Sequence, residues 1–121
     1  EGFDTSLAEG VILLTPFNAD AEDEKTKNFV AKYQEKHNEI PNQFAADAYD
    51  CVYAIYAALK ASDVKTSMTA AELGTILTNK FAGDFSVDGL TGQTMQWGTD
   101  GAVSKAPMAV VIENGIYVGK D

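Results

Sequence analysis

Ala109-Val-Val-Ile-Glu-Asn-Gly-Ile-Tyr-Val118 carries the clearest structural signal in the chain. Two runs rich in β-branched residues flank the pair Asn114-Gly115, and these two residue types readily adopt the positive φ angles that a type I′ turn requires. The stretch therefore predicts a β-hairpin with strands over residues 109–113 and 116–118.

The residues ahead of this hairpin also follow a strand-like pattern, punctuated by glycines from Phe81 onward. Met95 and Trp97 alternate with polar residues over 93–97, and Gly98-Thr-Asp-Gly101 has the composition of a turn. We expect a short strand over 93–97 that ends in this turn.

An apolar run near the start of the chain, Gly10-Val-Ile-Leu-Leu-Thr-Pro16, indicates another strand. Glycine and proline bound the run, and it contains the β-branched residues Val and Ile. It predicts a buried strand of about five residues that ends at Pro16.

Helical patterns lie between this strand and the later ones. A helix over 22–37 is indicated by acidic residues in its first turn and by Phe29 and Tyr33 on one face. A helix over 44–62 is apolar nearly all round beyond Asp50, so we expect it to be buried on most sides.

Thr69-Ala-Ala-Glu72 matches a capping box ahead of the apolar residues Leu73, Ile76 and Leu77. In this motif the threonine hydroxyl and the glutamate carboxylate each bond a free backbone N–H of the other residue. The motif predicts a short third helix. The order of strand, three helices and several strands is that of an α/β or α+β protein.

Length and charge narrow the classes of function. The 121 residues correspond to one modest domain. The chain has 18 acidic residues against nine basic ones, a net charge of −9, and every basic residue is Lys. Nucleic acids and anionic membrane surfaces are bound mainly through clustered Arg and Lys, so neither is expected as a partner.

Single copies of the most reactive residue types limit the possible chemistry. Cys51 is the only cysteine, which rules out an internal disulfide and a cysteine-based metal site. Its apolar helical surroundings predict a buried, unreactive thiol. His37 is the only histidine, and we expect it at the end of a helix, without the partners that nucleophilic catalysis needs.

Asp84-Phe-Ser-Val-Asp88-Gly89 begins like a calcium-binding loop. The twelfth position of such a loop requires a glutamate, and here it is Met95. We therefore interpret the stretch as a turn, and the sequence predicts no metal site and no cofactor.

Asp47 and Asp50 stand three positions apart near the start of the second predicted helix, with Phe44 one turn earlier. The two carboxylates could interact with the helix dipole, bind a ligand amine or form an acid/base pair. Phe44 could contact a ligand or pack in the core. These alternatives stay open at the level of the residues.

Five motifs in order resemble the branched-chain amino acid-binding family, the type I solute-binding proteins of ABC importers. The motifs are Gly10-Val-Ile-Leu-Leu-Thr-Pro-Phe17, Phe29-Val-Ala-Lys-Tyr33, Pro41-Asn-Gln-Phe-Ala-Ala-Asp-Ala-Tyr-Asp50, Gly89-Leu-Thr-Gly92 and Met95-Gln-Trp97. The terminal Asn-Gly hairpin completes the set, and the likeness covers nearly the whole chain.

The resemblance implies a receptor of two α/β lobes, joined by three hinge strands, that closes over a small ligand. This chain, residues 1–121, would be a C-terminal fragment with a partial type I periplasmic-binding-protein fold. It would comprise three helices, strands and a C-terminal β-hairpin, and would not be a complete lobe. Residues of about 18–86 would supply helices of the N-terminal lobe, and about 93–118 would supply strands returning toward the C-terminal lobe.

The resemblance also implies a site. Phe44 matches a family residue that contacts the ligand from the N-terminal lobe, Asp47 lies beside it, and Phe17 would lie on the hinge side. The implied protein is extracytoplasmic, either periplasmic or lipid-anchored, and its implied function is not enzymatic. Its partners would be an amino acid-like ligand and the membrane subunits of an importer.

Two other classes of function remain possible for this chain. One class is a ligand-sensing domain of a receptor or transcription regulator with the same fold. The other is a hydrolase, which only Asp47 and Asp50 support.

Because the chain starts at Glu1 rather than Met, we expect a processed end or an internal cut. With apolar faces left uncovered, the fragment should form a homo-oligomer.

Overall fold

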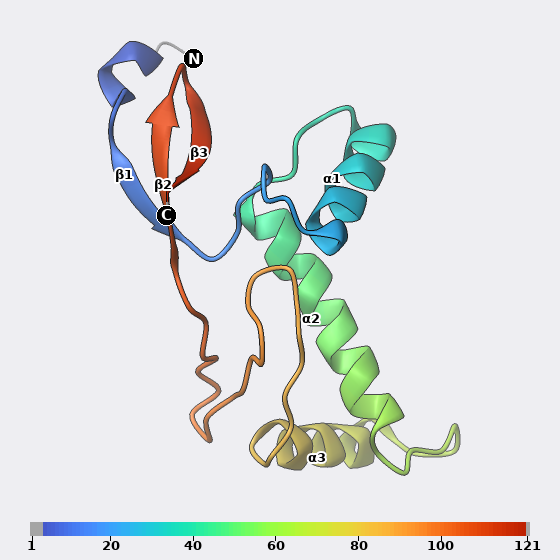
Figure 1. Ribbon diagram of the computed structural model, residues 1–121. Coiled ribbons are helices and arrows are strands. Elements are labelled where there is room, and N and C mark those ends of the chain that lie inside the picture. Colours follow the sequence, from blue (N-terminus) through green and yellow to red (C-terminus); the bar gives the residue numbers. More distant parts are fainter. Residues whose placement is uncertain (1–3, 121) are drawn as a thin grey trace. The chain divides into compact units, whose positions relative to one another are not determined.

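The computed structural model describes residues 4–120, and the chain divides into two compact units. Unit 1 comprises the chain up to Ala46 together with the part from Ala106 onward, and unit 2 comprises Asp47–Lys105. The elements in chain order are the 3₁₀ turn η1 (Thr5–Ala8), β1 (Ile12–Thr15), α1 (Glu24–His37), α2 (Gln43–Lys60), α3 (Ala70–Phe81), β2 (Met108–Glu113) and β3 (Ile116–Lys120) (Figure 1). The boundary after Ala46 therefore falls inside α2.

Unit 1 contains a three-stranded antiparallel sheet in the order β1-β2-β3. Asn114 and Gly115 have φ angles of 54° and 77°, which confirms the predicted hairpin between β2 and β3. The Glu9 carboxylate accepts hydrogen bonds from the backbone N–H groups of Asn114 and Gly115, at 2.9 and 2.8 Å. This contact ties the segment before β1 to the turn of the hairpin.

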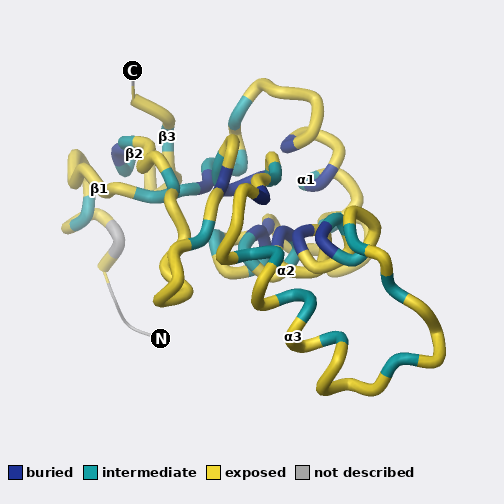
Figure 2. The backbone as a smooth tube through the Cα atoms, turned by 90° about the horizontal axis from the view of Figure 1, so that it is seen from below, coloured by how far each residue is buried: buried dark blue, intermediate teal, exposed yellow. Residues whose placement is uncertain are grey.

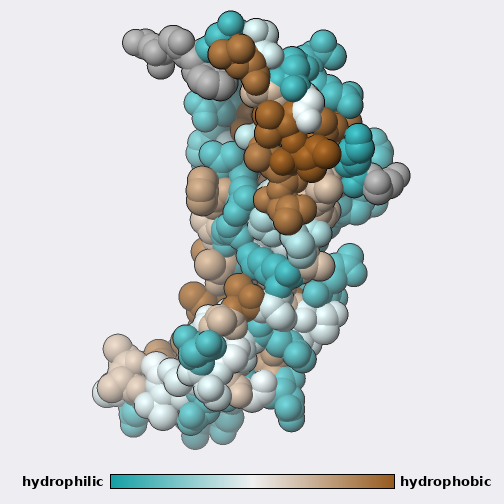
Figure 3. All heavy atoms as spheres, turned by 90° about the vertical axis from the view of Figure 1, so that its left-hand side faces the viewer, coloured by the Kyte–Doolittle hydropathy of each residue, from teal (hydrophilic) through white to brown (hydrophobic). Residues whose placement is uncertain are grey.

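The sheet leaves apolar side chains uncovered. Ile12 and Leu14 of β1 are exposed, as is Ile116 of β3, whereas Val110 and Val111 of β2 are buried. Figure 3 shows apolar residues gathered over this part of the chain. The predicted strand near residues 11–14 is confirmed, but its predicted burial is wrong, because within residues 4–120 no element covers this strand.

Capping residues define α1, and an aromatic pair holds it in unit 1. The Asp23 side chain accepts a hydrogen bond from the Thr26 backbone N–H, and Asn38 ends the helix in the left-handed conformation. Phe29 of α1 packs edge to face against Phe17, with ring centroids 5.9 Å apart, and both residues are buried. The predicted helix over 22–37 is confirmed, with its start at Glu24.

α2 buries a single line of residues spaced four apart, which lie on one side of a helix. This line consists of Ala46, Asp50, Ala54 and Ala58, and Figure 2 shows buried positions recurring along α2. Val52 and Tyr56 are exposed. The expected burial on most sides is wrong for this chain, since the described residues cover only this narrow side. Among them, no helix combines the length and apolar character needed to cross a membrane.

α3 begins at the predicted capping box. The Thr69 backbone N–H donates to the Glu72 carboxylate at 2.7 Å, and the Glu72 backbone N–H donates to the Thr69 hydroxyl at 3.3 Å. These reciprocal bonds satisfy two donors that a helix start leaves free, which confirms the prediction.

The segment between α3 and β2 contains turns and two isolated β-bridges, Val87 to Met95 and Trp97 to Val103. The predicted turn at 98–101 is confirmed by a hydrogen bond from the Gly101 N–H to the Gly98 carbonyl at 2.9 Å. The predicted strand over 93–97 is wrong, because the chain reverses on both sides and leaves no room for a longer ladder.

Candidate functional site

Asp50 is a buried carboxylate that holds a loop of unit 2 against α2. Its oxygens accept hydrogen bonds from the backbone N–H groups of Leu90 and Thr91, at 2.7 and 2.8 Å, and from the Thr91 hydroxyl at 2.7 Å. Asp50 is 5% exposed and Thr91 is 1% exposed. Three short bonds compensate for the removal of this carboxylate from water. Asp50 therefore joins α2 to a loop 40 positions away in the sequence.

Gly89 allows the loop to approach Asp50 so closely. A Cβ atom at this position would overlap the Asp50 carboxylate and would lie 2.5 Å from Cε of Met95. The Gly89 N–H donates to the Gly92 carbonyl at 2.8 Å, which closes the loop on itself. The motif Gly89-Leu-Thr-Gly92 thus forms a compact clasp around the carboxylate of α2.

A second acid of α2 extends this polar cluster. Asp47 Oδ1 lies 2.6 Å from Nζ of Lys105, and the same ammonium donates to the Thr91 hydroxyl at 2.6 Å. The side chains of Asp47 and Lys105 are 31% and 22% exposed, so the ion pair is half-buried. Asp47, Lys105, Thr91 and Asp50 therefore form one connected network, which we call the Asp47–Asp50 network.

The helix start itself is capped by a different residue. The Asn42 side chain accepts a hydrogen bond from the Ala45 N–H at 3.1 Å. Asn42, rather than Asp47 or Asp50, therefore satisfies this backbone donor at the start of α2. The acid/base alternative also lacks support, because each carboxylate is already bonded to donors of the network.

Phe44 lies in the first turn of α2 and is 76% exposed. The alternative of core packing is wrong within residues 4–120, since no described residue covers this ring. Phe17, the third predicted site residue, is 5% exposed and packs on Phe29. The three predicted site residues thus differ: Phe44 is open, Asp47 is paired, and Phe17 belongs to the aromatic core of unit 1.

Tyr49 stands beside Asp50 in α2, and its ring lies 4.4 Å from that of Tyr53. The pKa of Tyr49 is raised to about 12, first by its hydrogen bond with Tyr53 and then by burial. A phenol with this pKa stays protonated at neutral pH, so Tyr49 offers no general base.

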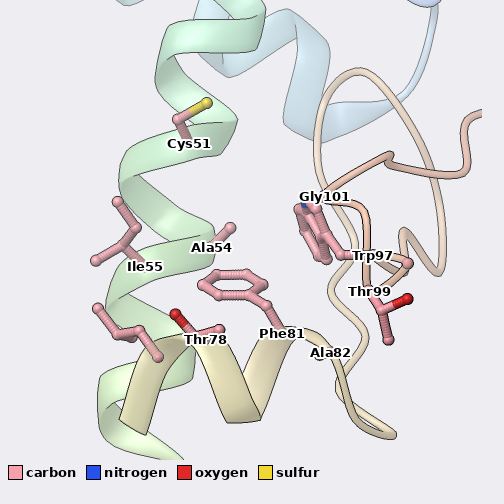
Figure 4. Close-up of a pocket in the computed structure, with 11 residues that line it drawn as sticks. Cys51, Ala54, Ile55, Thr78, Phe81, Ala82, Trp97, Thr99 and Gly101 are labelled. Atoms are coloured by element: carbon pink, nitrogen blue, oxygen red, sulfur yellow. The ribbon is translucent and has the colours of Figure 1, made fainter. Parts of the chain in front are cut away.

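Unit 2 also contains an apolar hollow of about 390 Å³ between α2, α3 and the turn after Trp97 (Figure 4). Phe81 and Trp97 stand in its wall with ring centroids 4.7 Å apart. Cys51 lies at this hollow and is exposed, so its predicted burial is wrong. Cys51 and Ile55, one turn later, both line this hollow, and the hollow leaves both side chains exposed.

The stretch that resembled a calcium loop is a turn only at its start: Asp84 lies in a turn, whereas Val87 forms an antiparallel bridge with Met95. The Asp88 carboxylate accepts a hydrogen bond from the Thr94 N–H at 2.7 Å. Across residues 4–120, no three acidic, histidine or cysteine side chains come together as a metal-binding group. His37 is the last residue of α1, and its ring lies 4.5 Å from that of Tyr33.

Sequence reasoning missed Lys105 and the role of Thr91. Thr91 lies in the motif Gly89-Leu-Thr-Gly92, and the two glycines of this motif are a usable signal for a tight loop. Lys105 stands alone in an irregular segment, 58 positions from Asp47, and no local pattern connects the two.

The family model described as a periplasmic binding protein matches residues 3–115. This chain belongs to that family. A search of curated proteins gives no match. The matches to solved structures give the fold: the three helices and the three-stranded sheet form part of a type I periplasmic-binding fold.

Three solved structures illustrate the relation to this family. A protein from Rhodospirillum rubrum assigned to branched-chain amino acid ABC transport is 28% identical, with a TM-score of 0.68 over 93% of this chain and 31% of its own. The branched-chain amino acid transporter substrate-binding protein LivJ from Streptococcus pneumoniae, in complex with isoleucine, is 26% identical, with a TM-score of 0.68 over 96% and 32%. An ABC transporter substrate-binding protein from Desulfitobacterium hafniense, in complex with Leu, is 20% identical, with a TM-score of 0.75 over 95% and 32%.

These three proteins are therefore about three times as long as this chain, which spans 31% or 32% of each of them. The Streptococcus pneumoniae and Desulfitobacterium hafniense proteins are transporter substrate-binding proteins, a class that binds a solute without converting it. The expected partial fold, less than a complete lobe, is confirmed.

Proposed function

We propose that the protein containing this chain is an extracytoplasmic solute receptor of an ABC importer that closes two lobes over an amino acid or a similar small polar ligand. The match of residues 3–115 to the periplasmic binding protein family is the main support. The complexes of LivJ with isoleucine and of the Desulfitobacterium hafniense protein with Leu support the ligand class. Such a receptor breaks no bond in its ligand, so it is not an enzyme.

Of the three proposed site residues, Phe44 is the one that we propose to contact the ligand directly. Its ring is exposed at the start of α2 and is free to cover the apolar part of an amino acid. Asp47 meets a cationic ligand group only in competition with Lys105, which already occupies one of its oxygens. Phe17 acts from the hinge side by shaping the packing around Phe29.

Removal of the Phe44 ring from the complete protein tests this site. Phe44→Ala should weaken binding of L-leucine and L-isoleucine by about 1–3 kcal/mol, the contribution of one buried apolar side chain. Isothermal titration calorimetry gives the affinity, and circular dichroism checks folding. Phe44→Leu is the matched control, because it keeps most of the apolar volume and should retain most of the affinity. Unchanged affinity in a folded Phe44→Ala variant would refute the assignment.

The same proposal assigns the segments of this chain to the two lobes and gives the partners and location of the complete receptor. Residues of about 18–86 belong to its N-terminal lobe and about 93–118 return toward its C-terminal lobe, and its membrane partners are the importer subunits. Cell fractionation of the complete protein tests the location, whether periplasmic or lipid-anchored. A DNA-binding domain at its N-terminus would instead favour the ligand-sensing regulator.

We also expect the isolated 121-residue chain to form a homo-oligomer. Ile12 and Leu14 on β1 and Ile116 on β3 are exposed, and both strands are edges of the sheet. Apolar surface and free edges of this kind are relieved by association. Light scattering at micromolar concentration is the test, and a stable monomer would contradict the expectation.

A further inference from the structure

Polar contacts anchor α2 at two adjacent turns. Asp47 Oδ1 lies 2.6 Å from Nζ of Lys105, while Asp50 accepts hydrogen bonds from the backbone of Leu90 and Thr91. The Thr91 hydroxyl joins the two anchors, since it donates to Asp50 and accepts from Lys105. Asp47 and Asp50 are three positions apart and so are neighbours on the helix surface. Together the anchors set the rotation of α2 about its axis.

Lys105 supplies the positive charge of this network, which contains two carboxylates. Its side chain is 22% exposed and that of Asp47 is 31% exposed, whereas the side chains of the ion pair Lys27–Glu22 are 49% and 88% exposed. Water therefore screens the Asp47–Lys105 pair less than the surface pair. Asp47 is the first residue of unit 2 and Lys105 is the last. The pair thus holds the two ends of this unit together.

Phe44 lies one turn before Asp47 on the same continuous helix. A rotation of α2 at Asp47 therefore carries the exposed ring of Phe44 with it. A rotation of about 20° moves a side chain on a helix of about 10–12 Å diameter by roughly 2 Å. In enzymes, a displacement of about 1 Å can cost on the order of 100-fold in reaction rate, so a shift of this size matters for a side chain that must fit a ligand.

We infer that Lys105 is a positioning residue for ligand recognition: it holds Asp47 and thereby sets the direction in which α2 presents Phe44 to the ligand. The inference rests on the proposed function, since it takes Phe44 as a ligand contact. Lys105 acts through Asp47 and the helix rather than by touching the ligand.

The first test compares ion-pair variants of the complete protein in calorimetric titrations with L-leucine. Lys105→Met removes the charge and keeps most of the aliphatic chain, and it should raise the Kd by about 5–20-fold. Lys105→Arg keeps the charge and should stay within about 3-fold of the wild type. Lys27→Met breaks the exposed pair with Glu22 and serves as the matched control, with no change expected.

A double-mutant cycle separates positioning from a general structural effect. In the Phe44→Ala background there is no ring to direct, so Lys105→Met should change the Kd by less than about 2-fold. An equal effect of Lys105→Met in both backgrounds would overturn the inference. An unchanged Kd in Lys105→Met alone would also overturn it, provided that Phe44→Ala weakens binding. If Phe44→Ala has no effect on binding, the proposed ligand role fails and the inference fails with it.

Hydrogen exchange over residues 43–49 gives a readout that needs no ligand. Lys105→Met should speed exchange there by about 10-fold or more relative to Lys27→Met, because the anchored turns of α2 open more easily. If Lys105→Met folds poorly, Asp47→Asn replaces it, since this change keeps the side-chain shape and removes the ion pair. Unchanged exchange in both variants would overturn the inference even where L-leucine fails to bind.

Discussion

The Asp50 carboxylate should carry a large share of the stability of unit 2, and Asp50→Asn tests this with the smallest change of shape. The wild-type carboxylate accepts three hydrogen bonds, one from Leu90 and two from Thr91. An asparagine keeps one acceptor oxygen. When that oxygen faces Thr91, the new amide N–H₂ group faces the Leu90 N–H, so two donors meet in a buried place.

The magnitude follows from these three bonds. Hydrogen bonds to a charged group contribute about 1.5–3 kcal/mol each, and bonds between neutral groups contribute about 1 kcal/mol. Asp50→Asn loses one charge-assisted bond, at about 1.5–3 kcal/mol, and weakens two others by about 0.5–2 kcal/mol each, so we expect a loss of about 2.5–7 kcal/mol. Since about 1.4 kcal/mol is a factor of ten, the amides of Leu90 and Thr91 should exchange about 50-fold faster or more.

Hydrogen exchange on the complete protein, read over residues 88–95, is the assay. Asp63→Asn is the matched control, because Asp63 is exposed and the same chemical change there should leave these amides unaffected. Exchange over 88–95 that changes by less than about 3-fold in Asp50→Asn would refute the reasoning. So would an equal acceleration in the control.

Three further predictions concern glycines and the cap of α3. Gly89→Ala places a methyl group against Asp50 and should lower the free energy of unfolding, measured in urea, by about 1–3 kcal/mol. The control is Gly74→Ala, which adds a methyl group inside a helix at a place with no atom within 4 Å. This control should raise the free energy of unfolding by about 1 kcal/mol. Thr69→Ala removes the hydroxyl of the capping box and should cost about 1 kcal/mol in the same assay, and a cost near zero would contradict the capping role. Hydrogen bonds from Thr69 lower the pKa of Glu72 below its ordinary value of 4.5, so its stabilising effect is complete above that pH and is lost as the pH falls through the lowered pKa. Glu72→Gln should abolish this part of the pH dependence, and an unchanged stability difference between variant and wild type from about pH 6 to pH 3 would contradict it.

The network of α2 could be anticipated only in part. The sequence drew attention to Asp47 and Asp50 as paired carboxylates on one helix, and both prove to be bonded. Their partners could not be read from the sequence, because Thr91 and Lys105 lie 41 and 58 positions away from them. Contacts at such separations depend on the path of the whole chain and leave no periodic pattern.

Burial was the property that the sequence predicted least well. Cys51 and the apolar residues of β1 were expected inside, and they are exposed. An apolar composition shows that a surface is more stable when it is buried. Whether it is buried depends on other segments that pack against it. Since this chain spans 31% or 32% of related structures, composition alone overestimates the burial found within it.

The sequence by itself determined the local elements of this protein: the Asn114-Gly115 hairpin, α1, α2, and the capping box at Thr69. These features depend on interactions within about four residues, so spacing and residue type are sufficient to predict them. The tertiary structure alone decided that Gly89 closes a loop on Asp50 and that Lys105 returns to Asp47. The physical reason is that a buried charge requires specific partners, and only the folded chain brings those partners within hydrogen-bond distance.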